Sequence, residues 1–422
     1  MKPEEVKKIS LGHYPTPLER MERLEKRLQK GPLYIKREDL SEMGLGGNKV
    51  RKLEYLVQEA KEQGCSVLLT YGGPQTNHGR LTVAAAVRMG MKAVLILDGD
   101  RPKRMSGNLI LDGLMGADLR FVGDADLEGL SIEEYRVRYA QKVEAMTRAV
   151  IQEYEDRGEK VYVIPVGGSN ERGALGYIQM IPELMEQMKN MGLDQATLVC
   201  GAGSMGTFAG LWLGVAYYQA PIRVVGISIN PQTDFTAEAV CEYIQRVSRT
   251  YEMGVTCSPG DLSIYFYTKK TPYAGAGYNV PDADTLSYIQ MMAETEAIFL
   301  DPCYTGKVFH GYADLLRRGE IPAEGAILLH TGGIPGLWAD EHVSAMQEML
   351  GGCQDTAMDR LHRMLSDMKK EQQELTAQLE DMKAKQQDRT YRFKEKMGQK
   401  LMNGQVYAKL RAYGLMDEDR ES

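Results

Sequence analysis

The sequence predicts an α/β protein of two lobes, built on mostly parallel sheets and followed by a helical C-terminal extension. Short apolar runs alternate with helical patterns from residue 33 to about residue 340, which is typical of βαβ units. Glycine-rich loops come after several of these runs, where open α/β sheets bind their ligands. Past residue 350, Lys, Glu, Gln and Met replace glycine, so a separate element is expected there.

The strands are expected where the apolar runs are richest in β-branched residues, and the helices where apolar residues recur every three or four positions. Expected strands are 33–36, 67–71, 93–97, 161–166, 197–200, 224–229 and 326–330. Expected helices are 52–63, 79–89, 132–154 and 207–218. The smaller lobe is placed at 47–160, and the larger lobe, which would bind the cofactor, at 1–46 plus 161–345.

A helical or coiled-coil extension is expected at 353–400, because apolar residues there repeat in steps of four and three. Gln372 interrupts this heptad seam, where it would weaken the seam or set its register. Self-association is expected, although a long helix laid on the protein's own surface would give the same pattern. Residues 401–422 form a tail that is expected to be partly disordered. The seam consists of Leu361, Leu365, Met368, Gln372, Leu375, Leu379 and Met382.

The composition excludes several classes of protein. A net charge of −7 argues against a dedicated nucleic-acid surface, because phosphate binding needs an excess of Lys and Arg. No stretch of about 18 apolar residues could span a bilayer, and no apolar leader begins the sequence, so a cytoplasmic location is expected. The six cysteines, at 65, 200, 241, 257, 303 and 353, lack metal-ligand spacing and are expected to be reduced thiols without a metal.

Lys49 lies in the most informative segment, residues 44–53. It follows a glycine turn and precedes an amphipathic helix, so the lysine is held at a fixed point that a bulky aldehyde cofactor can approach. A Schiff-base lysine is presented in this way. A lone Gly-Gly-Asn-Lys also occurs at the start of an ordinary surface helix, so this interpretation depends on the segments that follow.

Residues 200–207 form a glycine-rich loop between an expected strand and a helix, which suits an anion. Gly201, Gly203 and Gly206 match a dinucleotide fingerprint, but Asn230 stands after the next strand where that fingerprint needs an acid. A Walker loop is excluded because no Gly-Lys-Ser/Thr closes the segment. A monophosphate cofactor remains.

Further polar segments follow other strands. Residues 75–78, Gln-Thr-Asn-His, offer donors for a carboxylate and a phenolic oxygen at a helix start, although capping alone explains Thr76 or Asn77. Tyr278 and Tyr304 lie in glycine-flanked loops, where tyrosines stack on a flat ring or move protons.

Taken together, these segments resemble the pyridoxal-phosphate enzymes of the D-cysteine desulfhydrase and 1-aminocyclopropane-1-carboxylate deaminase family. The resemblance rests on Tyr-Pro-Thr-Pro-Leu at 14–18, Ile-Lys-Arg-Glu-Asp at 35–39, Gly-Gly-Asn-Lys-Val-Arg-Lys-Leu-Glu-Tyr-Leu at 46–56 and His-Thr-Gly-Gly-Ile-Pro-Gly-Leu at 330–337. It implies the fold of the tryptophan-synthase-β type, called fold type II, and pyridoxal 5′-phosphate as cofactor. The glycine-containing segments 166–170 and 173–176 are assigned to architecture.

The resemblance also implies roles for single residues. Lys49 would carry the cofactor as a Schiff base and then act as the base at Cα, Asn77 would bind the cofactor's O3′, and Thr331 would approach its ring nitrogen. Tyr304 would stack on or beside the ring, and Tyr278 would lie near the substrate. The phosphate would be held by Ala202, Gly203, Ser204, Met205, Gly206 and Thr207, and the substrate by Gln75, Thr76, Asn77, His78 and Tyr278.

The expected reaction is β-elimination from a small amino acid, foremost D-cysteine, which gives pyruvate, ammonia and sulfide. The deaminase branch has Tyr-Glu-Gly where this chain has Tyr304-Thr305-Gly306, so a carboxylate near the ring would be replaced by a hydroxyl. Thr76 in place of serine and the bulk of Met205 depart from the family pattern. Other substrates stay open: 1-aminocyclopropane-1-carboxylate, cysteate, D-serine and diaminopropionate.

A protein of another class also stays open, namely a non-catalytic assembly protein that acts through its heptads. The expected assembly is a homodimer or a higher homo-oligomer, formed through the body and the C-terminal heptads.

Overall fold

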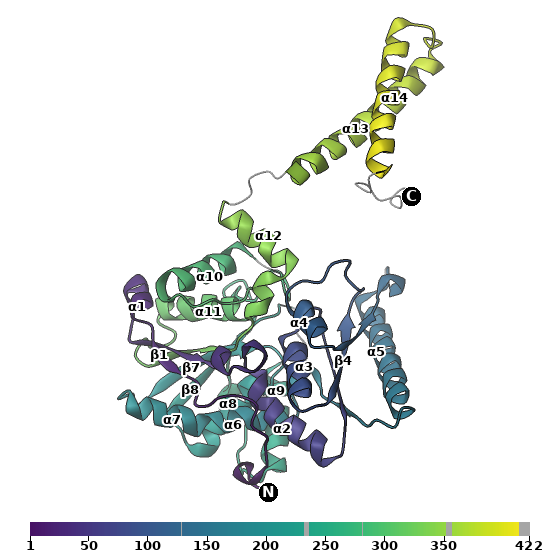
Figure 1. The fold of residues 1–422 in the computed structure, drawn as a ribbon. Helices are drawn as coiled ribbons and strands as arrows, with labels where there is room; N and C mark the ends of the chain where they lie inside the picture. Colours follow the sequence, from purple (N-terminus) through teal and green to yellow (C-terminus); the bar gives the residue numbers. More distant parts are fainter. Residues whose placement is uncertain (128, 232–235, 281, 352–356, 413–422) are drawn as a thin grey trace. The chain divides into compact units, whose positions relative to one another are not determined.

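The computed structural model describes residues 1–127, 129–231, 236–280, 282–351 and 357–412. It divides into a body, residues 1–349, and a C-terminal unit that begins at residue 350. The body contains two mostly parallel sheets with helices on their faces, which confirms the two-lobed α/β class (Figure 1). In the described part of the chain, no helix is long and apolar enough to cross a membrane.

The larger lobe is built on six strands in the order β1-β2-β10-β7-β8-β9, of which only β1 runs antiparallel to its neighbour. The central strand β10 is buried at every residue, as expected of a parallel strand covered on both faces. The strands are β1 (Leu18–Arg20), β2 (Leu33–Arg37), β7 (Ala196–Ala202), β8 (Ile222–Ser228), β9 (Ser263–Tyr265) and β10 (Ala326–His330).

Two groups of helices cover this sheet (Figure 1). Helices α6 to α9 form one core with the strand residues of one face, and α10 and α11 form another core on the opposite face. The helices of this lobe are α1 (Glu22–Leu28), α6 (Glu171–Ile178), α7 (Met180–Asn190), α8 (Gly206–Tyr218), α9 (Ala237–Thr250), α10 (Ala283–Glu296), α11 (Thr305–Arg318) and α12 (Asp340–Met349).

The smaller lobe has a parallel sheet in the order β5-β4-β3-β6. Its strands are β3 (Val67–Gly72), β4 (Lys92–Asp98), β5 (Asp118–Val122) and β6 (Val161–Val163). Its helices are α2 (Lys49–Glu62), α3 (Asn77–Arg88), α4 (Asn108–Leu114) and α5 (Ile132–Glu155). Val67 and Leu69 pack toward α5, whereas Leu68 packs with α2 and α3, because successive side chains of a strand point to opposite faces.

The boundary of the smaller lobe needs a correction. Strand β6 pairs with β3 from Val161 to Val163, and the amide of Ile164 still donates to the carbonyl of Leu69 at 2.8 Å. This hydrogen-bonded ladder keeps the chain in the smaller sheet beyond residue 160, where the sequence placed the boundary. The expected strand 161–166 also ends early, because residues Val166–Gly168 form a 3₁₀ turn.

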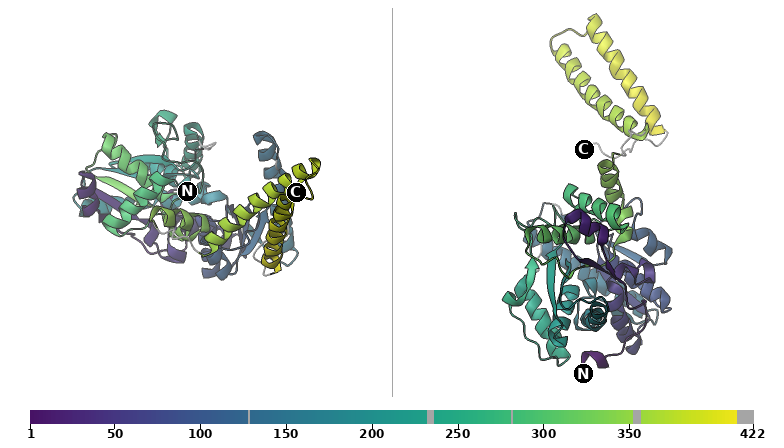
Figure 2. Two further views of the ribbon diagram at one scale, coloured as in Figure 1. Left: turned by 90° about the horizontal axis from the view of Figure 1, so that it is seen from above. Right: turned by 90° about the vertical axis from the view of Figure 1, so that its left-hand side faces the viewer.

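The C-terminal unit is a hairpin of two helices, α13 (Ala357–Ala384) and α14 (Tyr391–Ala412), which confirms the helical extension (Figures 1 and 2). Its buried core contains Leu379, Met382 and Phe393, of which the first two belong to the heptad seam. Helix α14 runs through residues 401–412, which the sequence had assigned to the tail, and residues 413–422 lie outside the described residues. The side chain of Leu361 also lies outside them.

Candidate active site

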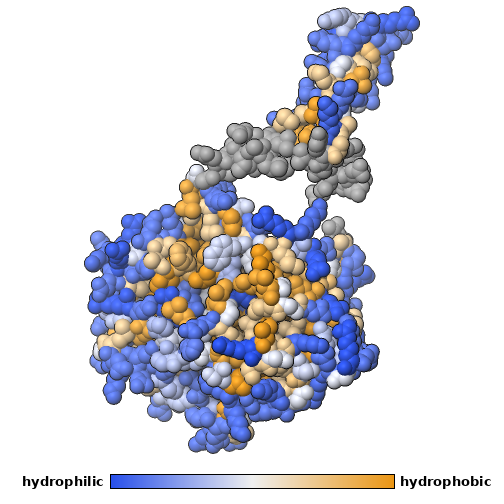
Figure 3. Space-filling view, in the orientation of Figure 1, coloured by the Kyte–Doolittle hydropathy of each residue, from blue (hydrophilic) through white to orange (hydrophobic). Residues whose placement is uncertain are grey.

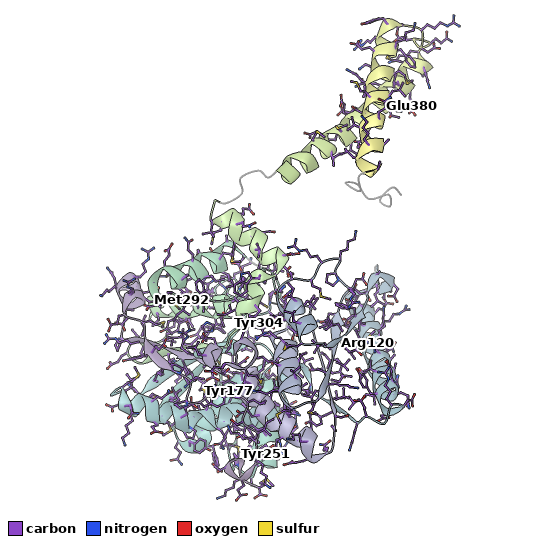
Figure 4. The ribbon with its side chains drawn as sticks, in the orientation of Figure 1. Arg120, Tyr177, Tyr251, Met292, Tyr304 and Glu380 are labelled. Atoms are coloured by element: carbon purple, nitrogen blue, oxygen red, sulfur yellow. The ribbon has the colours of Figure 1, made fainter. Side chains whose placement is uncertain are left out.

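A cavity of about 580 Å³ lies in the body at the carboxyl ends of the strands of both sheets. Open α/β sheets place their ligands there, because loops diverge at that edge. The cavity contains every site residue expected from the sequence except Gln75 and Gly206. Tyr304 lies near the centre of the body (Figure 4). The expected residues that line it are Lys49, Thr76, Asn77, His78, Ala202, Gly203, Ser204, Met205, Thr207, Tyr278, Tyr304 and Thr331.

Lys49 is the first residue of α2, and the glycines before it are required by the turn. Gly46 has φ +64°, and a Cβ there would lie 1.8 Å from the carbonyl oxygen of Asp39. The next amide, that of Asn48, donates to the carbonyl of Thr331 at 3.0 Å, which ties the lysine turn to the end of β10. Burial lowers the pKa of Lys49 to about 8, so a substantial part of its amines is neutral in mildly basic solution.

The helix that carries Lys49 is fixed by a buried ion pair. Arg51 donates from Nε to Oε2 of Glu38 at 2.6 Å and from Nη2 to Oε1 at 2.9 Å. The same carboxylate accepts the hydroxyl of Thr16 at 2.7 Å and that of Tyr177 at 3.0 Å. The segments 14–18 and 35–39, which carry part of the family resemblance, therefore hold α2 in place.

Residues 202–207 form a loop with the properties of a phosphate cradle. Met205 has φ +60°, and α8 begins at Gly206 with the positive end of its dipole toward the loop. A Cβ on Gly206 would lie 2.8 Å from both Nζ of Lys52 and Oγ of Ser169, so only glycine leaves this space open. Thr207 is held by Nδ2 of Asn48, which donates to its hydroxyl at 3.0 Å.

Lys52 is a second buried lysine beside this loop, and the sequence reasoning missed it. Its Nζ donates to the carbonyl of Gly167 at 3.1 Å, and burial together with Lys49 lowers its pKa well below the usual value. No acid contributes to that shift. A phosphate dianion in the loop would supply the missing opposite charge. Its spacing from Lys49, three residues along one helix, was the available signal.

The amino end of α3 presents the next group of polar side chains. Thr76 caps the helix by accepting the amide of Gly79 at 3.1 Å, and its own hydroxyl proton is still available to a ligand. Oδ1 of Asn77 accepts Nδ2 of Asn108 at 3.0 Å, which leaves the Asn77 amino group for the cavity.

His78 is neutral, because burial and the two lysines depress its pKa well below the usual value. Thr70 donates its hydroxyl proton to the carbonyl of Ile164 at 2.8 Å, so its oxygen accepts from Nε2 of His78, also at 2.8 Å. The buried Nδ1 of His78 then has a free lone pair and no partner among the described residues. His78 can therefore accept a hydrogen bond from a ligand but does not bring a positive charge.

Gln75 lies apart from the other expected substrate residues. Its Nε2 donates to the carbonyl of Ser106 at 3.1 Å, and its Oε1 accepts the amide of Asn108 at 2.9 Å. Both ends of the side-chain amide are thus used to hold the start of α4, and Gln75 does not line the cavity. The sequence could not reveal this, because the partner loop is about thirty residues away.

Tyr278 and Tyr304 meet through a contact between their hydroxyl groups, with ring centroids 5.8 Å apart at 80°. Burial raises the pKa of Tyr304 well above its usual value, so its hydroxyl group stays protonated across the physiological pH range. Thr305, in contrast, donates its hydroxyl to Oδ1 of Asp301 at 2.6 Å and does not line the cavity. The expected hydroxyl near the ring is therefore not that of Thr305.

The outer wall of the cavity was not foreseen. It consists of Tyr71 in β3, Asp98 at the end of β4 and Val143 on α5. Tyr139 of the same helix donates to Oδ1 of Asp98 at 2.6 Å. Asp98 is the only acid among the described lining residues, and it belongs to the smaller lobe. The described residues contain no cluster of acids, histidines and cysteines that could hold a metal ion.

Comparisons with known proteins agree with this geometry. The family model described as "Pyridoxal-phosphate dependent enzyme" matches residues 9–332. A Pyrococcus abyssi protein named putative 1-aminocyclopropane-1-carboxylate deaminase is 34% identical over 331 residues, which are 78% of this chain and 93% of that protein. A Yersinia enterocolitica protein named D-cysteine desulfhydrase is 34% identical over 325 residues, 77% of this chain and 93% of that protein.

A solved structure gives the same result. It is described as an ACC deaminase homologue, and it matches with a TM-score of 0.69 at 30% identity. The match covers 82% of this chain and 97% of that one.

Proposed function

This chain belongs to the pyridoxal-phosphate-dependent enzyme family, and from that membership we propose that it eliminates the β-substituent of D-cysteine, giving pyruvate, ammonia and sulfide. The family relationship makes it a pyridoxal-phosphate-dependent lyase or deaminase. The observation that supports elimination most is the chemistry of the cavity: Lys49 lines it, and the larger lobe contributes hydroxyl and amide groups but no carboxylate among the described lining residues.

The residues of the cavity fit the cofactor. The open space at Gly206 and the buried amine of Lys52, which has no acid beside it, suit its phosphate, and the amino group of Asn77 suits its phenolic oxygen. Lys49 supplies the amine that would bind its aldehyde. When bound, pyridoxal phosphate supplies an electron-accepting ring that stabilises negative charge at the Cα of an attached amino acid.

The chain's own groups would then perform the proton transfers. Thr76 and the amino end of α3 bind the substrate carboxylate, because a hydroxyl donor and a positive helix end converge there. The amine of Lys49, whose pKa is about 8, takes the proton from Cα. The Cβ–S bond breaks with its electron pair on sulfur. A protonated tyrosine of the Tyr278–Tyr304 pair then donates its hydroxyl proton to the leaving thiolate. Released 2-aminoacrylate reacts with water to pyruvate and ammonia.

Ring-opening deamination of 1-aminocyclopropane-1-carboxylate is the second candidate. It is favoured by the names of relatives that are 34% and 35% identical to this chain and by the paired tyrosine hydroxyls, which could protonate a carbon instead of a sulfur. Cysteate, D-serine and diaminopropionate would use the same groups. The buried free cysteines support our proposal of a cytoplasmic site of action, where thiols stay reduced.

A substrate panel tests the proposal. The purified enzyme is given D-cysteine, L-cysteine, 1-aminocyclopropane-1-carboxylate, D-serine, cysteate and diaminopropionate, and sulfide, pyruvate and 2-oxobutanoate are measured. D-cysteine should give equal amounts of sulfide and pyruvate. Release of 2-oxobutanoate from the cyclopropane compound, with no sulfide from D-cysteine, would refute elimination and support the second candidate.

The role of Lys49 has its own test. Borohydride reduction of the purified enzyme, followed by digestion and mass spectrometry, should locate the cofactor on the peptide that contains Lys49. Lys49→Ala should abolish turnover without changing the circular dichroism, and Lys61→Ala, on an exposed part of the same helix, is the control. An adduct on any other lysine would contradict the assignment.

A further inference from the structure

The C-terminal hairpin has too small a core to be complete by itself. Its buried residues Leu375, Leu379, Met382 and Phe393 lie in the half of the hairpin nearer the turn, and Met397 packs against the last three. The family match ends at residue 332, so this unit is not explained by the proposed reaction. Two helices alone bury little apolar surface, and helical hairpins of this kind are completed by further helices.

The middle of the hairpin exposes apolar side chains instead of burying them. Leu401 is 63% exposed and Met402 is 64% exposed on α14. Leu401 lines a groove of about 440 Å³ together with Gln372, Met397, Lys400, Gly404, Gln405 and Ala408. The small residues Gly404 and Ala408 would let another helix approach closely. Figure 3 shows apolar residues interspersed along the hairpin.

Two buried polar atoms in this region lack partners. Gln372 donates from Nε2 to the carbonyl of Lys400 at 3.4 Å, but its Oε1 is buried without a hydrogen bond in the described part of the chain. The hydroxyl of Tyr407 is in the same situation. A buried polar atom without a partner costs about 1 to 3 kcal/mol. Gln372 as a whole is only half-buried and lines the groove, so a second chain seated there would meet its side chain.

The positions of these residues indicate which partner fits. Gln372 lies within two residues of the middle of the 28-residue helix α13, and Leu401 lies within one residue of the middle of the 22-residue helix α14. Consider two identical hairpins that pack face to face, point in opposite directions and overlap along their full length. The two-fold axis that relates them then passes the middle of α13 and the middle of α14. A two-fold axis brings each residue near it against its own copy. An amide is self-complementary, because each copy offers both a donor and an acceptor.

We propose that the hairpin pairs with the hairpin of a second copy of this chain to form an antiparallel four-helix bundle, with Gln372 against its symmetry mate. Leu401 and Met402 then form the centre of the new core. A single polar residue in such a seam fixes the register of the paired helices, and this is the role of Gln372 in the proposed bundle. The inference does not depend on the substrate or on whether the bodies also associate.

Cross-linking of the full chain tests the contact. In a Cys353→Ser background, Gln372→Cys is incubated with oxidised glutathione, which is reduced as two thiols become one disulfide. Gln372→Cys should give a covalent dimer of twice the 47.2 kDa chain mass on a non-reducing gel. Gln399→Cys, an exposed residue of α14 outside the groove, should give several-fold less.

A second substitution shows whether the apolar surface holds the pair together. Adding Leu401→Glu to Gln372→Cys should reduce the covalent dimer to the Gln399→Cys level, with unchanged helix content by circular dichroism. Adding salt should raise the yield, because α14 carries six basic residues and one acid and so repels its copy. A Gln372→Cys yield no higher than that of Gln399→Cys, a yield insensitive to Leu401→Glu, or a yield that falls with salt would each overturn the proposal.

Discussion

Asn108 donates its side-chain amide to Oδ1 of Asn77 across a distance of 3.0 Å. Asn108 is fully buried and also donates to the carbonyl of Gln75 at 2.8 Å, so its own orientation is fixed. The contact therefore decides which end of the Asn77 amide enters the cavity: the amino group, which can donate to a phenolic oxygen.

Asn108→Leu should weaken cofactor binding about tenfold, because the loss of one oriented hydrogen bond is worth on the order of 1.4 kcal/mol. The affinity of the apoenzyme for pyridoxal phosphate is measured by absorbance titration. Asn190→Leu, at the exposed end of α7, is the matched control and should bind normally. An unchanged affinity in Asn108→Leu would show that Asn77 is oriented by other contacts.

Gly206→Ala should reduce cofactor affinity by at least about tenfold, since the new methyl group fills the phosphate space. It would lie 2.8 Å from Nζ of Lys52 and from Oγ of Ser169, and 3.2 Å from Cα of Ser169. Gly260→Ala is the control, because a methyl group there meets nothing within 4 Å. Cofactor content after dialysis measures the effect, and full retention would argue against this loop as the phosphate site.

Glu38→Gln should lower the free energy of unfolding by about 2 kcal/mol, because it removes one of the two carboxylates that pair with the buried guanidinium of Arg51 and leaves only Glu183. Urea unfolding of the apoenzyme measures the loss. Glu186→Gln, on the exposed face of α7, should change stability by no more than about 0.5 kcal/mol. Equal stabilities of the two variants would mean that the ion pair does not hold α2.

The rate at which the apoenzyme takes up pyridoxal phosphate should depend on pH through Lys49. Only the neutral amine attacks an aldehyde, and burial lowers the pKa of Lys49 to about 8. The rate should therefore rise about tenfold per pH unit below about pH 8 and level off above it. Stopped-flow absorbance gives the profile. A midpoint near the ordinary lysine value would contradict the burial of the amine.

Asp112 should make the body less stable as pH rises from about 4 to 7. Burial raises the pKa of this carboxyl from 3.8 to about 7, although Arg80 opposes the shift. In that range the folded protein keeps a proton that the unfolded chain releases, so rising pH favours unfolding, by up to about 1.4 kcal/mol per pH unit.

Urea unfolding at several pH values checks this prediction. Asp112→Asn should remove the pH dependence, and Asp156→Asn, an exposed residue just after α5, should leave it unchanged. If the free energy of unfolding falls equally with rising pH in both variants, a group other than Asp112 causes the effect.

The central strands of both sheets and the edge strand β6 could be predicted from the sequence, but the edge strands β1, β5 and β9 could not. Strands β2, β3, β4, β7, β8 and β10 are mostly buried, and their apolar runs are long enough to recognise. Strands β1 and β9 have three residues each, and β5 carries Asp118 and Arg120, which pair with each other. Short, polar edge strands resemble loops, because one side of such a strand is not covered.

The site was predictable where single loops carry its chemistry and not where distant elements meet. Lys49, Asn77 and the 202–207 loop each follow a strand or a glycine turn that the sequence displays. The wall formed by Val143 and Asp98 depends on how α5 packs against β4, and the use of Gln75 depends on α4. Local pattern contains no information on such tertiary contacts.

The anion that would bind beside Lys52 affects the stability of the protein as well as its activity. Burial with no acid beside it disfavours the ammonium form of Lys52 until an anion arrives, so the vitamin-derived phosphate would complete the interior as well as the active site. Cells short of that vitamin would then hold an enzyme that is both idle and easier to unfold and degrade. Abundance and activity would fall together, without any dedicated regulator.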